Sequence, residues 1–169
     1  MTKRRVLPAT VALFLGLTAY APAMVDHPPI KEGYWSMHTK MSNGPNKPPI
    51  EGTRFVCHSH EYDQYVEATG SESKKKQNCK TISENLSGGT YTSETQCTVA
   101  GSLITTKLKT VLTGDSSHTE TSTTYDPPFH GQSEATMIQD QKWVGSCPAG
   151  IQPGDTVAQD GSVMHLWKH

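Results

Sequence analysis

Residues 55–64 (FVCHSHEYDQ) contain several side chains that bind metal ions in other proteins. Cys57, His58 and His60 are followed by Glu61 and Asp63, and thiolate, imidazole and carboxylate groups suit zinc or copper. The spacing is not that of a zinc motif, because neither a CxxC pair nor an HExxH helix occurs in the chain. We therefore expect no metal or other cofactor, and we rank His58 and His60, which we expect on the surface, as weak metal candidates.

The same stretch has the pattern of a helix start. Ser59 is a typical N-cap, and Glu61 and Asp63 then fall in the first turn, where the helix dipole favours negative charge. We predict a short helix over residues 60–68, followed by an exposed loop over residues 71–78 that contains three consecutive lysines. The helix has three apolar positions spaced to lie on one face: Tyr62, Tyr65 and Val66.

Catalytic motifs are missing from the chain. It has no GxSxG elbow, no P-loop and no GxGxxG fingerprint. Scattered Asp, His and Ser residues are expected by chance in so polar a sequence, although a triad assembled in space would leave no linear motif. We therefore expect a protein that is not an enzyme.

The N-terminal residues predict export. Three basic residues, Lys3 to Arg5, precede an apolar run over residues 6–17, and Ala21 and Ala23 provide the small side chains that signal peptidases need. The run is shorter than the roughly 20 residues that span a bilayer. We predict a signal peptide over residues 1–23, a single β-rich domain over residues 24–169, and a periplasmic or secreted protein that does not span the membrane.

Four cysteines lie in the exported part, and an even count in an oxidising compartment predicts two disulfides. Four cysteines allow three connectivities. We predict pairing of Cys57 with Cys79, which would close the helical segment at its own ends, and of Cys97 with Cys147. This leaves no free thiol to act as a nucleophile or a metal ligand.

The net charge of −1 and a pI near 6.7 give no electrostatic reason to expect nucleic acid as a partner.

Most of the mature chain alternates with period two and is rich in Thr, Tyr and Val, which is typical of strands. Short Gly-containing turns join antiparallel neighbours. The expected strands cover residues 33–42, 53–57, 80–86, 90–100, 103–113, 116–125 and 132–144, and residues 156–159 and 162–167 form a C-terminal hairpin.

These elements predict a mainly β fold: a single curved antiparallel sheet, in the form of a half-barrel or open barrel of about seven strands, with one short helix after Cys57 and a C-terminal hairpin. Ile104, Leu108 and Leu112 share one face with Thr106 and Thr110. So many hydroxyls on an inner face fit either a thin core with hydrogen-bonded threonines or the lining of a cavity.

Two functions fit such a sheet. The first is a non-catalytic module that binds a small apolar ligand inside the curved sheet. The second is an envelope-associated protein that recruits a protein partner along an exposed edge strand. For the first, the candidate pocket residues are Trp35, Met37, Tyr91, Ile104, Leu108, Met137 and Trp143.

The order of four short motifs resembles the bacterial family known as domain of unknown function 3617. The motifs are KEGYW at residues 31–35, FVC at 55–57, KWVGSCP at 142–148 and IQPGD at 151–155. In the first motif, Glu32 stands where the family usually has proline. The resemblance implies a small exported protein with a β-rich, disulfide-containing fold, and it implies no activity and no catalytic residues.

Overall fold

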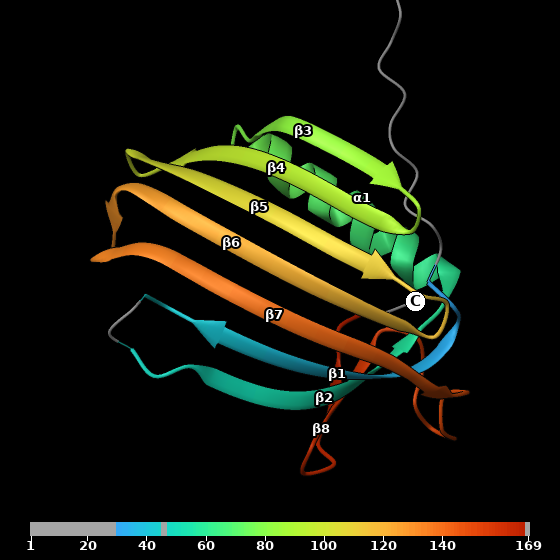
Figure 1. Cartoon of the computed structure of the whole chain (residues 1–169). Helices are drawn as coiled ribbons and strands as arrows, with labels where there is room; N and C mark the ends of the chain where they lie inside the picture. Colours follow the sequence, from blue (N-terminus) through green and yellow to red (C-terminus); the bar gives the residue numbers. More distant parts are fainter. Residues whose placement is uncertain (1–29, 45–46, 168–169) are drawn as a thin grey trace, which may run out of the picture.

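The computed structural model describes residues 30–44 and 47–167, so the predicted signal peptide lies outside the described residues. The chain is mainly β and forms one antiparallel sheet of nine strands with the order β3-β4-β5-β6-β7-β1-β2-β8-β9 (Figure 1). The predicted fold class is confirmed, with seven long strands and a C-terminal hairpin. The elements are β1 (Gly33–Ser42), β2 (Ile50–His58), α1 (His60–Lys76), β3 (Lys80–Ser87), β4 (Thr90–Val99), β5 (Ser102–Leu112), β6 (Ser116–Phe129), β7 (Gln132–Gly145), β8 (Asp155–Ala158) and β9 (Val163–His165).

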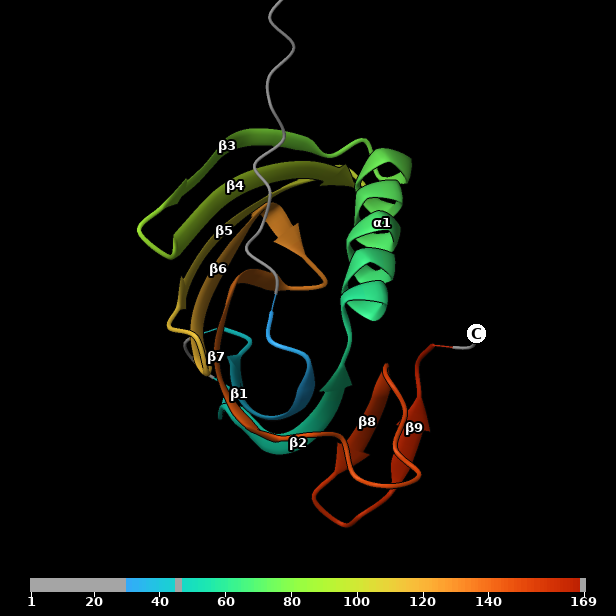
Figure 2. The same ribbon diagram turned by 90° about the vertical axis from the view of Figure 1, so that its right-hand side faces the viewer.

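The sheet is strongly curved, and α1 stands across its open side (Figure 2). Strands β3 to β7 form a meander, whereas β1 and β2 pair on the other side of β7. The connection through α1 therefore leads from β2, near one end of the sheet, to β3 at the opposite edge. A half-barrel closed by one helix is the result.

The inner face of this half-barrel is unusually polar for a protein interior. The hydroxyls of Thr110 and Thr119 lie 3.0 Å apart across β5 and β6, and Thr106 and Thr123 make a similar contact at 3.2 Å. Such cross-strand pairs satisfy hydroxyls that are costly to bury alone. The apolar core is small in consequence, and its members are Trp35, Met37, Val56, Cys57, Tyr62 and Tyr91.

Helix α1 begins where the sequence predicts, because the Ser59 hydroxyl accepts a hydrogen bond from the backbone amide of Tyr62. It ends at Lys76 rather than at residue 68, so the predicted loop over residues 71–78 is wrong. Asn78, at a φ of 51°, closes the helix, and the Cys79 amide bonds to the Lys74 carbonyl. The three lysines occupy the last turn, where positive charge is favourable to the helix dipole.

The predicted disulfide pairing is wrong: the bridges join Cys57 to Cys147 and Cys79 to Cys97. A helix of 17 residues is roughly 25 Å long, so a bridge cannot connect Cys57 before it to Cys79 after it. Lys80 pairs with Gln96, which places Cys79 and Cys97 opposite one another with Cα atoms 4.1 Å apart. One bridge therefore anchors the chain at each end of α1.

The C-terminal hairpin of β8 and β9 extends the sheet beside β2, with Thr156 paired to Val56. Asp155 fixes its start, because the carboxylate accepts hydrogen bonds from the Gln152 amide at 2.8 Å and from His165 at 2.6 Å. Trp167 then packs against Tyr62 and Tyr65 of α1. The chain end thereby joins the hairpin to the helix on the open side of the half-barrel.

Candidate functional site

The main cavity of the described residues has a volume of about 1080 Å³. Three elements enclose it: the inner face of the sheet, the first two turns of α1 and the C-terminal hairpin. This volume matches the upper end of typical small-molecule sites, which span roughly 300–1000 Å³. Its size is sufficient for a long acyl chain or a comparable ligand.

The lining is mainly apolar and comes from opposite parts of the sheet. Strands β4 and β5 supply one wall, β1 and β2 supply another, and the hairpin and α1 supply the rim. Val163, Met164 and Leu166 of the rim are exposed, with Met164 61% exposed. The apolar lining residues are Ile30, Met37, Val56, Tyr62, Val66, Tyr91, Leu108, Leu112, Ala158, Val163, Met164 and Leu166.

The structure brings together some of the seven predicted pocket residues. Met37, Tyr91 and Leu108 line the main cavity, whereas Trp35, Ile104 and Trp143 line neither this cavity nor a smaller one. Met137 and Leu108 line that smaller hollow of about 600 Å³ across β3 to β7, where charged residues such as Glu94 and Lys107 also lie.

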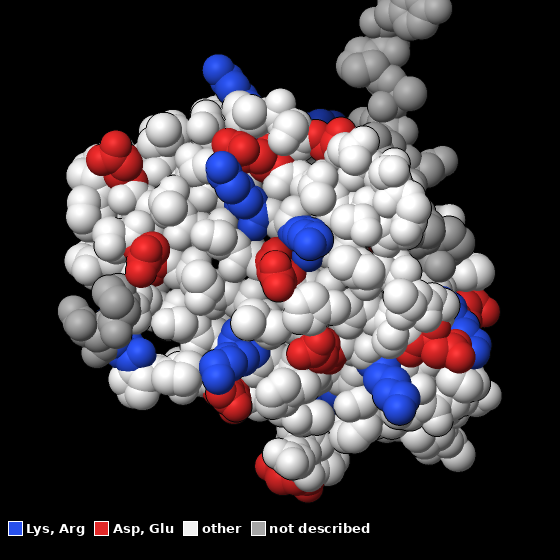
Figure 3. Space-filling model, in the orientation of Figure 1, with Lys and Arg blue, Asp and Glu red and all other residues white. Residues whose placement is uncertain are grey.

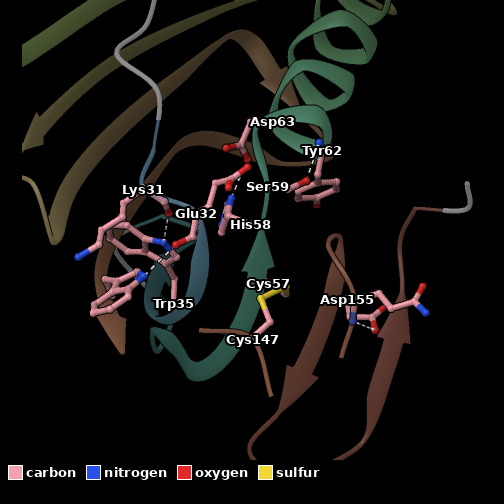
Figure 4. Close-up of a disulfide and its surroundings, with 12 residues drawn as sticks. Lys31, Glu32, Trp35, Cys57, His58, Ser59, Tyr62, Asp63, Cys147 and Asp155 are labelled. Atoms are coloured by element: carbon pink, nitrogen blue, oxygen red, sulfur yellow. Dashed lines mark hydrogen bonds and ion pairs between the residues drawn. A yellow bond between two sulfur atoms is a disulfide. The ribbon is translucent and has the colours of Figure 1, made fainter. Parts of the chain in front are cut away.

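Trp35 and Trp143 have a structural role beside the cavity. The indole N–H of Trp35 donates to the Lys31 carbonyl at 2.8 Å, and that of Trp143 donates to the Glu32 carbonyl at 3.1 Å. The Lys31 ammonium lies 3.5 Å from the centre of the Trp143 ring, a cation–π contact. Figure 4 shows the Trp35 indole beside Lys31 and Glu32. The two indoles fix the chain that enters β1 next to the cavity.

Arg54 is the cavity's distinctive polar residue. It is the only arginine after Arg5 in the sequence, and it lies on β2 in the cavity wall. Its Nε lies 3.2 Å from the sulfur of Met37, a weak acceptor. Within residues 30–44 and 47–167, no carboxylate forms an ion pair with it.

Tyr62 lies beside this arginine on the first turn of α1. Its side chain is only 8% exposed and lines the cavity, and its hydroxyl makes no hydrogen bond to any of the described residues. Burial raises the pKa of Tyr62, the nearby Asp63 carboxylate adds to the rise, and the positive charge of Arg54 opposes it. The phenol is therefore a protonated donor at neutral pH.

His58 and Asp63 form a pair at the same corner of the cavity (Figure 4). His58 Nδ1 lies 2.7 Å from Asp63 Oδ1, and the imidazole packs edge-on against Trp35 and Tyr62. The His58 side chain is 10% exposed, so the expectation that it lies on the surface is wrong. Its Nε2 has no partner among the described atoms, and neither has Asp63 Oδ2.

Within the part of the chain that the structure describes, the His58–Asp63 pair does not belong to a metal centre or a catalytic triad. His60 faces Glu32 at 3.6 Å, away from the His58 pair, and no three metal-ligating side chains converge. A serine-type dyad needs a hydroxyl on the free imidazole nitrogen, and His58 Nε2 has none.

Tyr91 closes the opposite side of the cavity. It is buried on β4, and its hydroxyl donates to the Glu84 carboxylate of the edge strand β3. Burial and this carboxylate raise the pKa of Tyr91 to about 12. The Tyr91 hydroxyl is thus already occupied, unlike that of Tyr62.

The outer face of the sheet carries interspersed charges of both signs (Figure 3). Lys40 pairs with Glu51 at 2.7 Å and Lys107 with Glu94 at 3.6 Å. A surface on which positive and negative charges are mixed does not form the basic patch that typically binds nucleic acid. None of the helices in the described ranges is long and apolar enough to cross a membrane.

Comparison with known proteins then identifies the family. The model of the family described as "Protein of unknown function (DUF3617)" matches residues 30–147. The chain belongs to this family. No curated protein and no solved structure matches the chain. The DUF3617 match covers the sheet from β1 to β7 and both disulfides, whereas the hairpin that completes the cavity follows it.

Several cavity residues were not among the pocket residues predicted from the sequence. Arg54, Tyr62 and the hairpin residues face the cavity only because β2, α1 and the C-terminal hairpin meet on the open side of the half-barrel. One signal was available in the sequence, because Arg54 is the only arginine after Arg5 and the other basic residues after Arg5 are lysines and histidines. The two disulfides are consistent with a compartment outside the cytoplasm.

Proposed function

We propose that this DUF3617 protein is a periplasmic, non-catalytic module that binds a small apolar ligand in the cavity between the sheet, α1 and the C-terminal hairpin. The observation that carries the proposal is the cavity of about 1080 Å³ with a mainly apolar lining. Apolar cavities with a few polar groups are the usual form of small-ligand sites.

The shape of the half-barrel supports this proposal. A sheet whose inner face served only as a core would be filled by large side chains, but here threonines occupy much of it and bond to each other across strands. The exposed apolar rim formed by Val163, Met164 and Leu166 is costly in water unless something covers it. A bound apolar ligand would cover both the inner face of the sheet and the apolar rim.

The alternative function is recruitment of a protein partner along the edge strand β3. All of β3 except Leu86 is exposed, which favours this idea. However, β3 has a register shift between Thr81 and Ser83 and carries Lys80 and Glu84, and bulges and charges are the features with which native proteins prevent edge pairing. We therefore favour the cavity.

A fluorescence titration with the neutral apolar probe N-phenyl-1-naphthylamine tests the proposal. Leu108→Asp places a carboxylate in the cavity wall and should weaken probe binding at least about tenfold, because an apolar ligand would desolvate the charge. Leu103→Asp is the matched control, since Leu103 lies on the same strand, is exposed and does not line the cavity. It should leave binding unchanged.

Met164→Asp repeats the test without risk to the fold, because Met164 is largely exposed yet lines the cavity. Thermal unfolding of each variant verifies that it is folded. If the probe fails to bind the wild type, or binds the folded Leu108→Asp and Met164→Asp variants as well as the wild type, the cavity is not the binding site.

A further inference from the structure

We infer that the ligand is a single-chain amphiphile whose anionic head group binds Arg54 and Tyr62 while its apolar chain fills the cavity. This inference rests on the proposed function and names the class of ligand. The shared chemistry of the head group is a carboxylate or a phosphate monoester, both of which a guanidinium binds through paired hydrogen bonds.

The environment of Arg54 is the first argument. A guanidinium has five N–H donors, and the thioether of Met37 is its one hydrogen-bond acceptor in the described chain. The other mature basic side chains are lysines and histidines, and several lysines pair with acids on the outer face. Arg54 is instead an exposed residue on the wall of the apolar cavity and has no carboxylate partner among the described residues, so its donors are available to a ligand.

Tyr62 is the second and independent argument. Tyr62 is only 8% exposed and lines the cavity, and its hydroxyl has no hydrogen-bond partner in the described residues. The burial that raises its pKa keeps the phenol protonated, so it donates to an oxyanion instead of repelling it.

The other acidic side chains at this corner are Asp63 and Glu67, and neither pairs with Arg54. Asp63 Oδ1 lies 2.7 Å from His58 Nδ1, so this carboxylate is engaged with the imidazole. Glu67 lies one turn further along α1, is exposed and makes no ion pair with Arg54. Arg54 is therefore the cationic side chain at this corner that has no ion-pair partner among the described residues.

The apolar chain has a defined path from this corner. Leu108 and Leu112 of β5 and Tyr91 of β4 form the wall across the cavity from β2. The Tyr91 hydroxyl is already bonded to Glu84, so that wall presents mainly carbon atoms and hydroxyls that have partners. A head group at β2 would direct the chain toward β4 and β5.

Calorimetric titration of the mature, disulfide-bonded chain with two probes of equal chain length tests the inference. Dodecanoate and dodecanol, both below their aggregation limits, differ only in the head group. Arg54→Met should weaken dodecanoate binding about tenfold to a hundredfold, as expected for loss of a charge-assisted hydrogen bond. It should change dodecanol binding by less than about threefold, because the apolar contacts remain.

Matched variants separate the local effect from a change in net charge. Lys142→Met removes a positive charge from the exposed face of β7, outside the cavity, and should leave both affinities unchanged. Tyr62→Phe should weaken dodecanoate several-fold and not dodecanol. Glu67→Gln removes a carboxylate from the cavity rim and should not weaken dodecanoate. Dodecyl phosphate distinguishes a phosphate site from a carboxylate site by its affinity relative to dodecanoate.

The outcomes distinguish the two levels of the proposal. If dodecanol binds as tightly as dodecanoate to the wild type, or Arg54→Met weakens both equally, the head-group inference is overturned and the apolar cavity stands. Tighter binding of dodecyltrimethylammonium than of dodecanoate would also overturn it. If no probe binds to the wild type, the proposed function fails and the inference fails with it.

Discussion

The two disulfides should contribute unequally to stability, and the difference follows from their loops. The Cys57–Cys147 bridge closes a loop with a sequence separation of 90, and the Cys79–Cys97 bridge one of 18. In the chain-entropy model these loops give roughly 4.5 and 3 kcal/mol of stabilisation. Replacing both cysteines of a bridge by serine should therefore cost about 1.5 kcal/mol more for the longer loop.

The structure strengthens this expectation. Cys57 is 1% exposed and sits at the end of β2 against the segment after β7 (Figure 4), so a serine there adds a buried hydroxyl that needs a partner. Cys79 and Cys97 lie toward the β3 edge of the sheet, where we expect the β3–β4 pairing to hold the register after the bridge is lost.

Urea unfolding followed by tryptophan fluorescence measures the two losses, with the oxidised wild type as reference. Peptide mapping without reduction first establishes that each double variant retains the other bridge. A larger loss for the Cys79→Ser/Cys97→Ser variant, or recovery of a peptide that links Cys57 to Cys79 from the wild type, would refute this reasoning.

Three further predictions concern single side chains. Ser59→Ala should destabilise the protein by about 1 kcal/mol in urea unfolding, since it removes the N-cap of α1; Ser71→Ala, at an exposed position within the helix, should not destabilise it. Burial alone would raise the pKa of Asp155, but hydrogen bonds from Gln152 and His165 lower it overall. The stability due to Asp155 is therefore present above the unfolded-state pKa, near 4, and is lost as pH falls through the folded-state value. The unfolding free energy of Asp155→Asn should depend less on pH in this range than that of the wild type. The hydrogen bonds that the His118 ring donates to the Asp140 and Glu120 carboxylates raise the pKa of His118. Its NMR titration midpoint should therefore lie above that of a free histidine and should fall in Asp140→Asn, and an unshifted midpoint would contradict the contact.

The sequence was a good guide to the strands, because period-two alternation and Gly-containing turns are local signals. The prediction for β1 matched Gly33–Ser42, and β4 and β5 were placed to within one residue at each end. Local signals are weaker where a partner extends a strand. β2 begins at Ile50, earlier than expected, because Ile50 pairs with Met41 of β1.

Features that depend on distant parts of the chain were not predictable in this way. A polar run without an apolar stripe is typical of a loop, so the sequence does not predict the last turns of α1, although lysines are favourable at a helix C-terminus. The shorter predicted helix made a Cys57–Cys79 bridge plausible. The candidate pocket was similarly incomplete, since the contributions of Arg54, Tyr62 and Met164 depend on how α1 and the hairpin meet over the sheet.

Native mass spectrometry of the protein purified from the periplasm without detergent tests the central claim most directly. The account predicts a population with one non-covalent adduct of lipid-like mass per chain, released by organic solvent and strongly reduced in the folded Met164→Asp variant. Only the mass of the bare polypeptide, in both proteins and under conditions that preserve known lipid complexes, would contradict the claim that the cavity holds an apolar ligand.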